Sequence, residues 1–353
     1  MHRVCKSLTE QGYEVHLVGR IRYNSRPLHE RPYRTHRMRL FFDRGKMFYL
    51  EFTFRLFWYL IFKKCDILLS NDLDTLFPNF MVAKFRRKRL LYDSHELWTE
   101  IPELLDRPTT RKVWHWLEKR LFKRLKYAYT VNQSIADFYK EKYGVNVQSV
   151  RNLPLRKPAA AARKGPEKVL LYQGALNTGR GIEMMIEAMK FMPDYRLIVV
   201  GFGTEEEVLP EKAKAWGVAE RVDFRGYVAF QDLHAITQEA SLGFSLEEDR
   251  GLSYRFALPN KLTDYVQAGV PVIVSDLPEM RRMVEEHGLG EMLPAEARNA
   301  EALANLVRGV MENEEKWLEY HRNCLKAAEE LCWEKEEKKL LRILEAAQAK
   351  SIL

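Results

Sequence analysis

Short apolar segments alternate with helical patterns along the whole of this sequence, and the alternation restricts the chain to an α/β fold. In the first half the apolar segments are Val15–Val18, Ile67–Leu69, Leu90–Tyr92 and Tyr129–Val131. In the second half they are Val169–Tyr172, Arg196–Val200, Arg221–Phe224, Leu242–Ser245 and Val270–Val274. Each is followed by a turn and usually by a helical pattern, which is typical of βαβ units. We therefore predict doubly wound parallel sheets.

The length of the chain predicts two domains. It has 353 residues, whereas single hydrophobic cores rarely grow beyond about 250–300 residues. Residues 153–168 read LPLRKPAAAARKGPEK, which is rich in Pro, Ala and Lys and lacks periodicity, so a linker is predicted there. The predicted domains are residues 1–153 and 154–331. Residues 332–353 carry a charged amphipathic pattern that predicts a terminal helix.

The cysteines and the apolar stretches indicate a reducing, cytoplasmic setting. Cys5, Cys65, Cys324 and Cys332 form no CxxC pair, which argues against a disulfide framework and a zinc site. The first residues do not resemble a secretion signal, and no uncharged stretch reaches the roughly 18 residues expected of a membrane span. We expect a cytoplasmic protein.

Charge is distributed unevenly between the two halves. Residues 1–153 hold 30 Lys and Arg against 16 Asp and Glu, while residues 154–353 hold 27 against 33. A basic first half suggests an anionic partner, such as phosphate, a membrane surface or nucleic acid, although many basic faces are only solvated. The basic residues are dispersed and no nucleic-acid-binding signature is present, so nucleic acid is the weaker alternative.

The first residues depart from the usual order of a doubly wound domain. The segment MHRVCKSLTEQ has a helical pattern and precedes the strand expected around Val15, whereas such a domain normally begins with a strand. We therefore expect the first strand of the N-terminal domain to be missing, with a central sheet position vacant. The backbone N–H and C=O groups of the strands beside that position would lack hydrogen-bond partners.

A glycine-rich turn follows the first strand expected in the second half. Gly174, Gly179 and Gly181 surround Arg180 between that strand and a helical pattern. Exposed backbone N–H groups, a helix start and a guanidinium can together hold a pyrophosphate. The alternative is an ordinary turn with a surface arginine. Gly201 and Gly203, in the next such turn, are interpreted as shaping this region.

A further candidate segment is SYRFALPNKLTDYVQAGVPVIVSD, residues 253–276. Pro259 and Asn260 suit a helix start, with Asn260 as the N-cap, and Lys261 lies in the first turn. Asp264, one turn further on, can accept hydrogen bonds from ribose hydroxyls. Alternatively, Asp264 only complements the helix dipole.

In the first half, two polar segments follow expected strands. LLYDSHE places His95 and Glu96 after a strand, and NDLD places Asp72 after another. Asp72 is predicted to cap a helix and, with Glu96, to line an acceptor side. His95 and Glu96 do not form an HExxH motif, so a zinc hydrolase has little support. We expect no metal site.

The aromatic stretch KMFYLEFTFRLFWYLIFKK, residues 46–64, has basic ends. Our preferred interpretation is a buried helix of the first domain. The alternative is an interfacial helix that, with KFRRKR at 84–89, contacts anionic lipid.

These segments together resemble a retaining GT-B glycosyltransferase of the large family four, also described as glycosyl transferases group 1. The resemblance covers nearly the whole chain and rests on the order and spacing of its segments, which are SLTEQGYEVHLVGR, LLYDSHELWTEIPEL, YTVNQSIADFYKEKYG with VRNLP, YQGALNTGRGI, IVVGFG, FRGYV and LPNKLTDYVQAGVPVIVSD. It implies two Rossmann-like domains facing a cleft, with the donor bound mainly by the second and the acceptor mainly by the first. It also implies that the terminal helix crosses back to the first domain.

The resemblance assigns roles to particular residues and also shows departures. Arg180 lies where the family has a diphosphate-binding lysine, Asp264 where it has the second glutamate of E-x7-E, and His95 where it has a histidine near the reacting centre. Phe256 stands in place of the first glutamate, and Ala175 in place of an arginine. Glu247 or Glu248 can replace the missing carboxylate, and Arg255 the missing cation.

The resemblance implies sugar transfer from a nucleotide-diphosphate donor to a hydroxyl acceptor with retention. The stretch from Gly174 to Gly181, with Asn260, Lys261 and Asp264, is expected to bind the donor, and no further cofactor is expected. A role in bacterial surface polysaccharide or glycolipid synthesis, peripheral on the inner face of the membrane, is also implied. The alternative is a non-catalytic relative that retains the site.

Overall fold

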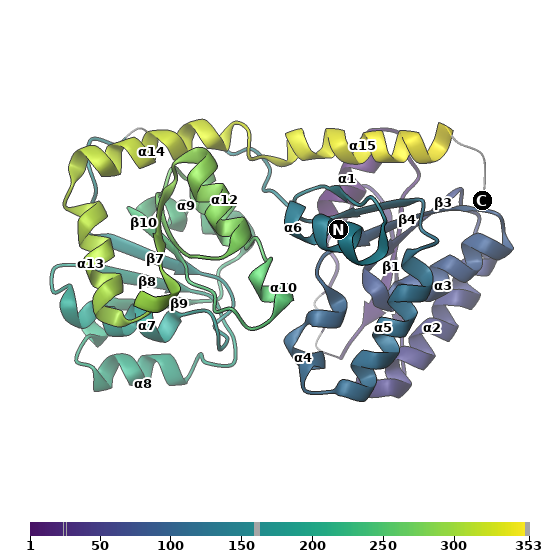
Figure 1. Cartoon of the computed structure of the whole chain (residues 1–353), viewed down its shortest axis with the longest axis horizontal. Coiled ribbons are helices and arrows are strands. Elements are labelled where there is room, and N and C mark those ends of the chain that lie inside the picture. The colour runs from purple at the N-terminus through teal and green to yellow at the C-terminus, as the bar shows by residue number, and fades with distance from the viewer. Residues whose placement is uncertain (24, 26, 159–162, 350–353) are drawn as a thin grey trace. The chain divides into compact units, whose positions relative to one another are not determined.

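The chain divides into two compact units in the computed structural model, which describes residues 1–23, 25, 27–158 and 163–349 (Figure 1). Unit 1 comprises Met1–Arg151 together with Lys335–Leu353, and unit 2 comprises Asn152–Glu334. Residues 159–162 of the predicted linker and 350–353 of the predicted terminal helix lie outside the described residues. The described residues of 153–168 contain no helix or strand before Lys168.

Unit 1 contains parallel strands covered by helices. Its strands are β1 (His16–Ile21), β2 (Arg34–Arg39), β3 (Ile67–Asn71), β4 (Arg89–Ser94), β5 (Tyr127–Thr130) and β6 (Gln148–Ser149). Its helices are α1 (His2–Glu10), α2 (Gly45–Phe62), α3 (Asp72–Phe85), the 3-10 turn η1 (Trp98–Glu100), α4 (Pro102–Leu105), α5 (Pro108–Phe122), α6 (Gln133–Tyr143) and the terminal α15 (Trp333–Ala349).

The strands of unit 1 form two separate sheets. In the described residues β1 pairs in parallel with β2, and a second parallel sheet has the order β3-β4-β5-β6. The first element is the helix α1, whose Val4, Cys5 and Ser7 are buried. A helix therefore precedes the first strand, as the sequence predicts, and β1 and β3 are not paired with each other.

The terminal helix α15 packs on unit 1 from Lys335 onward. The buried carboxylate of Glu336 accepts hydrogen bonds from the Arg151 guanidinium at 2.8 and 3.0 Å. Ser7 donates to Glu337 at 2.6 Å, and Arg89 donates to the Gln348 carbonyl at 2.8 Å. Residues far apart in the sequence thus join the terminal helix to the body of unit 1.

Unit 2 contains one parallel sheet. Its strands are β7 (Val169–Gln173), β8 (Arg196–Val200), β9 (Val222–Gly226), β10 (Leu242–Ser245), β11 (Val272–Ser275) and β12 (Gly290–Leu293). Its helices are α7 (Ile182–Ala188), η2 (Met189–Phe191), α8 (Val208–Ala215), η3 (Ala219–Arg221), α9 (Phe230–Glu239), α10 (Leu252–Arg255), α11 (Asn260–Gln267), α12 (Pro278–His287), η4 (Ala295–Ala297), α13 (Ala300–Met311) and α14 (Glu314–Ala328).

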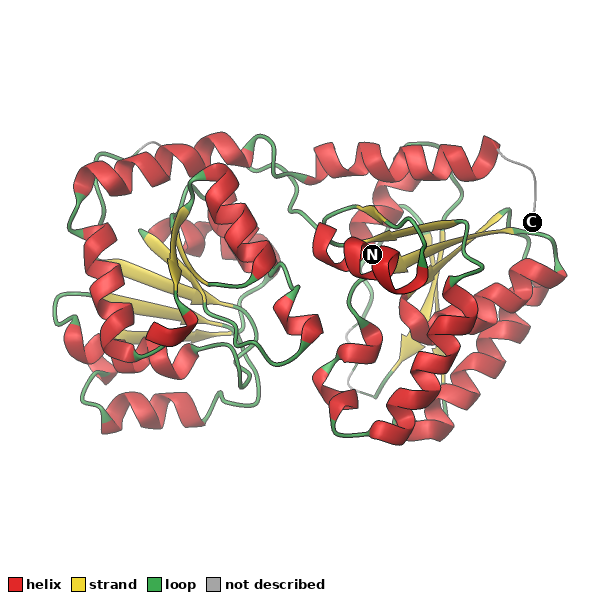
Figure 2. Cartoon of the chain, in the orientation of Figure 1, coloured by secondary structure: helices red, strands yellow, loops and turns green. Residues whose placement is uncertain are grey.

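The strand order of unit 2 is β12-β11-β10-β7-β8-β9, so the direction of chain progression reverses between β7 and β10. Figure 2 shows the strands of this unit in yellow with helices around them. Helices α7, α8 and α13 pack together in one layer, and α9, α11, α12 and α14 pack together in the other. Ligands of doubly wound sheets bind at the carboxyl ends of the strands, beside such a reversal. The segments after β7 and β10 are therefore the first place to look for a site.

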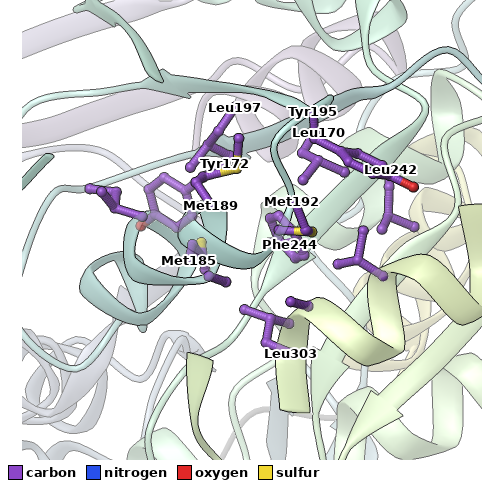
Figure 3. Packing of buried hydrophobic residues seen from close by; sticks show 14 of the residues in the cluster. Leu170, Tyr172, Met185, Met189, Met192, Tyr195, Leu197, Leu242, Phe244 and Leu303 are labelled. Carbon is purple, nitrogen blue, oxygen red and sulfur yellow. The ribbon is translucent and has the colours of Figure 1, made fainter. Parts of the chain in front are cut away.

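The core of unit 2 holds this reversal point rigidly. Figure 3 shows Leu170 and Tyr172 of β7 near Met185, Met189 and other buried apolar side chains, including Phe244 of β10 and Leu303 of α13. The side chains named here are at most 1% exposed. Close packing of this kind fixes the strand ends from which the candidate site is built.

Some strands were not predicted. The sequence of β2, Arg34–Arg39, is mostly basic and polar, and β6 and β12 are short. They are edge strands of their sheets, where fewer apolar residues are needed. The nine predicted strands are all present, with ends that differ by a few residues.

Helix α2 corrects our preferred interpretation of the aromatic stretch. Its Phe48, Phe52, Leu56 and Leu60 are buried, but its opposite side is exposed, so the helix is only half covered within unit 1. Among the described residues, no helix is both long enough and apolar enough to cross a membrane.

Candidate functional site

The glycine turn of unit 2 packs against the segment that follows β10. Gly179 and Gly181 have φ of +84° and +72°, where residues with side chains are strained. A Cβ on Gly181 would lie 2.5 Å from the Leu246 carbonyl oxygen. The Gly179 carbonyl accepts a hydrogen bond from the Glu248 N–H at 2.9 Å. These glycines therefore allow two strand-end segments to meet at the reversal point.

The turn after β8 supports this arrangement. Gly201 has φ of +145°, and a Cβ there would lie 1.8 Å from the Gly174 carbonyl oxygen. A Cβ on Gly203 would lie 2.4 Å from the Leu176 carbonyl oxygen. Both glycines permit close backbone approach, in accord with the shaping role expected of them.

A buried carboxylate holds two cations at the reversal point. Glu247, 1% exposed, follows β10, and its Oε1 lies 2.8 Å from Lys261 Nζ of α11 and 3.5 Å from the Arg180 guanidinium. Ser245 donates to the other carboxylate oxygen at 2.8 Å. Lys261 also lies over the Tyr172 ring, and Arg180 over the Tyr254 ring. We call Arg180, Glu247 and Lys261 the cation cluster.

The charges of the cation cluster lower the pKa of its carboxylate. Burial alone would raise the pKa of Glu247, but the charge and hydrogen bond of Lys261, with Ser245 and Arg180, lower the pKa below its ordinary value. Burial lowers the pKa of Lys261, against the opposing effect of Glu247. One carboxylate thus balances two cations, and the cluster retains an excess of positive charge suited to an anion.

Three residues predicted to contact the donor sugar form ion pairs within unit 2. The Glu247 carboxylate is buried and pairs with Lys261 and Arg180, and its contact with a donor sugar stays a prediction. Glu248 pairs with Arg250 at 2.8 Å, and Arg255 pairs with Asp249 at 3.5 Å. The cation that accompanies Arg180 is therefore Lys261 and not Arg255.

The start of α11 also differs from the prediction. Asn260 is its first helical residue and Pro259 is the N-cap, so Asn260 does not cap the helix. Its side-chain oxygen instead accepts a hydrogen bond from Asn152 at 3.3 Å. The helix begins one residue earlier than its capping pattern suggested, because Pro259 already holds the extended conformation of an N-cap.

Asp264 lines a small pocket of unit 2. The other residues that line it include Gln173, Thr237, His234 and Phe230. Thr237 donates to Gln173 Oε1 at 2.8 Å, while the buried Gln173 amide nitrogen has no hydrogen-bond partner among the described residues. The pocket therefore presents a carboxylate and an amide donor to polar groups of a ligand.

A second cluster lies in unit 1, at the carboxyl ends of β3 and β4. His95 Nε2 lies 3.0 Å from Asp93 Oδ2, and Asp93 also accepts a hydrogen bond from Tyr129 at 2.9 Å. Asp93 is buried, whereas the His95 side chain is 30% exposed. Burial lowers the pKa of His95, but the hydrogen bond and charge of Asp93, with Asp72, raise it above the ordinary value.

Asp72 adopts a strained backbone conformation in this cluster. Its φ is +56°, which is uncommon for a residue with a side chain and marks candidate functional positions. Asp72 Oδ1 accepts the His95 N–H at 2.8 Å. Its carboxylate makes no capping bond to α3, whose N-cap is Asn71, so the predicted capping role is wrong.

Neighbouring carboxylates make this cluster acidic. Burial raises the pKa of Asp72 to about 7 and that of Asp74 to about 6. Glu96 lies close enough for its charge to raise the pKa of Asp74 further. We call Asp72, Asp74, Asp93 and His95 the carboxylate cluster. Among the described residues, no group of three or more His, Cys, Asp or Glu side chains has the arrangement of a metal site.

Comparisons with known families cover both units. The family model described as Glycosyltransferase Family 4 matches residues 1–154, and the model described as Glycosyl transferases group 1 matches residues 156–331. Both units therefore match glycosyltransferase models, and the chain has the two-domain α/β fold of the GT-B glycosyltransferases.

Similarity to individual proteins agrees with this family. The chain is 30% identical over 172 residues to a phosphatidyl-myo-inositol mannosyltransferase of Mycobacterium leprae, a match that covers 47% of this chain and 43% of that protein. The chain thus spans less than half the length of that curated relative.

Two solved structures share the fold. Sucrose-phosphate synthase from Thermosynechococcus elongatus has a TM-score of 0.78 at 18% identity, with 98% of this chain and 92% of that chain covered. HepE of Anabaena, in complex with UDP-glucose, has a TM-score of 0.69 at 15% identity, with 89% and 86% covered.

Sequence reasoning missed Arg298 of unit 2, which contacts the segment that carries Glu247. Arg298 donates to Ser275 Oγ at 2.7 Å and to the Leu246 carbonyl. Ser275 in turn donates to the Glu247 carbonyl at 2.7 Å. Arg298 therefore fixes the segment that carries Glu247. No local motif marks it, because its partners are distant in the sequence.

Proposed function

We propose that this GT-B glycosyltransferase transfers a sugar from a nucleotide-diphosphate donor to a hydroxyl acceptor, with retention of configuration. The observation that carries the proposal is the cation cluster, in which Arg180 and Lys261 share the single buried carboxylate of Glu247 at the reversal point of a doubly wound sheet. An anion is the ligand that such an excess of positive charge binds best. The UDP-glucose complex of HepE, which shares the fold, supports a nucleotide-sugar donor.

The diphosphate and the ribose of the donor have candidate partners in unit 2. Arg180, Lys261 and the N–H groups of the glycine turn, Gly174 to Gly181, would hold the diphosphate. Asp264 would accept hydrogen bonds from ribose hydroxyls. Negative charge gathers on the departing diphosphate during glycosyl transfer, so these cations stabilise the transition state more than the ground state.

The role of Glu247 in this proposal is to position the two cations. An ionised, fully buried carboxylate keeps Lys261 from turning away into solvent and holds Arg180 beside the glycine turn. Because two cations carry the charge of the leaving group, the proposed reaction does not require a divalent metal. Activity should then persist in excess chelator.

Unit 1 would supply the acceptor side. His95, with a raised pKa, would hold a sugar hydroxyl or developing negative charge, and Asp72 and Glu96 would contact the acceptor. The similarity to a phosphatidyl-myo-inositol mannosyltransferase favours a lipid-linked or glycan acceptor. We propose a place in bacterial surface polysaccharide or glycolipid synthesis, at the inner face of the membrane.

A panel of nucleoside diphosphates and nucleotide sugars, read by melting temperature, tests the proposal. A ligand at about 100 times its dissociation constant adds roughly 2.7 kcal/mol to the free energy of unfolding. We expect one base to raise the melting temperature of the wild type clearly more than that of Arg180→Ala. Equal shifts in both proteins, or no shift with any base, would contradict donor binding at the cation cluster.

A non-catalytic relative is the second candidate, and a specific observation favours it. Ala175 and Phe256 stand where the family resemblance predicts an arginine and a glutamate. Slow hydrolysis of the donor distinguishes the two candidates. If the chain is an enzyme, hydrolysis is measurable and is lost in both His95→Ala and Arg180→Ala; if it only binds, nucleotide stabilises the fold and no hydrolysis occurs.

A further inference from the structure

Helix α2 is apolar on both sides, yet only one side is covered. Its inner side repeats at every fourth residue and is buried, whereas the outer side consists of Met47, Leu50, Phe54, Trp58 and Phe62. These five side chains are between 46% and 79% exposed. We call them the α2 apolar face. Helices that are apolar all round are normally buried or lie in a membrane.

The aromatic residues of this face form one continuous surface. The rings of Phe54 and Trp58 lie 6.1 Å apart, and those of Trp58 and Phe62 lie 5.9 Å apart. The surface extends onto α3, where the ring of Phe85, itself 64% exposed, lies 6.3 Å from that of Phe57. Helices α2 and α3 lie side by side (Figure 1). A contiguous apolar surface of this kind marks an interaction site.

Positive charge is concentrated at one end of this surface. Lys63 and Lys64 follow α2 directly, and Lys84 and Arg87 lie at the end of α3; all four are exposed. The neighbouring acid Asp66 is paired with Lys88 at 3.3 Å, and Glu51 with Arg55 at 2.8 Å. The basic end is therefore not neutralised by these acids.

Exposed aromatic side chains next to cations indicate which kind of partner the α2 apolar face fits. Aromatic side chains beside Lys and Arg are the pattern of segments that lie at a lipid–water interface, with rings at the headgroup level and cations on phosphates. A second copy of the chain would repel in either orientation, because α2 has exposed cations at both ends: Arg44 and Lys46 at its start, Lys63 and Lys64 after it. An anionic lipid surface attracts them.

We propose that the α2 apolar face docks on an anionic lipid bilayer. The helix lies in the plane of the interface, because its inner side is already packed against unit 1. Phe54, Trp58 and Phe62 enter the boundary between headgroups and acyl chains, and Lys63 and Lys64 contact lipid phosphates. The inference does not depend on the proposed sugar transfer, since it concerns binding in the absence of any donor.

Flotation with vesicles tests this docking. The full chain is mixed with vesicles of phosphatidylcholine alone or of phosphatidylcholine with 30% phosphatidylglycerol, at low and high salt. We expect binding to the anionic vesicles and at least tenfold weaker binding to the neutral ones. The double variant Phe54→Ser with Trp58→Ser should lower the anionic-vesicle partition coefficient at least tenfold. Lys63→Glu with Lys64→Glu should lower it similarly, and salt should matter less for that variant.

Matched controls keep the result interpretable. Phe230→Ser replaces an aromatic residue of unit 2 that is 59% exposed, and it should leave vesicle binding unchanged. Melting temperatures should be nearly equal for all variants, because the replaced side chains are exposed. Failure of the wild type to bind anionic vesicles, or equal binding by the α2 variants, overturns the proposal. So does a concentration-dependent dimer in sedimentation that the Phe54 and Trp58 changes abolish.

Discussion

The cation cluster of unit 2 and the carboxylate cluster of unit 1 occupy equivalent places, at the carboxyl ends of parallel strands, but their charges differ in kind. In unit 2 two cations surround one carboxylate whose pKa is lowered. In unit 1 several carboxylates surround one histidine, and the pKa values of Asp72 and Asp74 are raised to about 7 and about 6. The same architecture thus supports anion binding in one unit and proton exchange near neutral pH in the other.

The cause of the difference is the number of cations that each cluster receives. Glu247 is buried and Asp72 is half-buried, and removal from water raises the pKa of each. Lys261 and Arg180 outweigh that effect at Glu247, whereas His95 alone does not outweigh it at Asp72. Position in the fold brings polar groups together, and the balance of charges decides their chemistry.

Among the changes that test this comparison, removal of the Glu247 carboxylate should have the largest effect on stability. Glu247→Gln leaves two cations without their counter-ion, and loss of one partner from a buried ion pair costs about 3–5 kcal/mol. We expect a fall of that size in the free energy of unfolding, measured in urea. The control Glu248→Gln removes an exposed partner of Arg250 next in the chain and should cost less than about 1 kcal/mol. If Glu247→Gln changes the free energy of unfolding as little as Glu248→Gln does, the Glu247 carboxylate does not hold Arg180 and Lys261 in place.

Substitution of Gly201 tests whether the close approach of its backbone to that of Gly174 is needed for stability. In Gly201→Ala the new Cβ meets the Gly174 carbonyl at 1.8 Å in a strained conformation. We expect the free energy of unfolding to fall by about 1–3 kcal/mol. Gly309→Ala in α13 is the matched control, because nothing lies within 4 Å of its Cβ. That change should be neutral or stabilise by up to about 1 kcal/mol.

Loss of one cation should weaken anion binding without unfolding unit 2. Arg180→Ala removes a charge-assisted contact of about 1.5–3 kcal/mol, so the dissociation constant for the preferred nucleoside diphosphate should rise about tenfold to a hundredfold. Titration calorimetry measures it. Lys190→Ala, which removes a surface cation paired with Glu187, should leave the constant unchanged. If both variants lose the same affinity, the nucleotide responds to the overall charge of the protein and is not bound at the cation cluster.

The smallest expected effect concerns the pKa of His95. Asp93→Asn removes the carboxylate that favours the imidazolium, and burial should then bring the pKa of His95 below its ordinary value of 6.5. NMR titration of the histidine signals measures this, with His234 of unit 2 as the internal control. Because the folded pKa is raised in the wild type, His95 stabilises the fold below pH 6.5. That contribution disappears as the pH rises through the folded pKa. If the pKa of His95 is the same in Asp93→Asn as in the wild type, Asp93 is not what raises it.

Local patterns in the sequence determined the secondary structure and the approximate location of the site. Apolar periodicity predicted the central strands, because buried strands need nearly continuous apolar residues, and the turns that carry Arg180, Lys261 and His95 followed from their positions after those strands. The basic strand β2 escaped prediction, because an edge strand does not need an apolar sequence.

Tertiary structure alone decided which charges meet. Glu247, Lys261 and Arg298 are separated along the chain, and only strand order brings them to the reversal point between β7 and β10. Nothing in the sequence indicated the left-handed backbone of Asp72, and the sequence left open whether α2 is buried all round or exposed on one side. Both depend on what packs beside them. Propensity and periodicity act between neighbours in the chain, whereas burial and charge pairing act between neighbours in space.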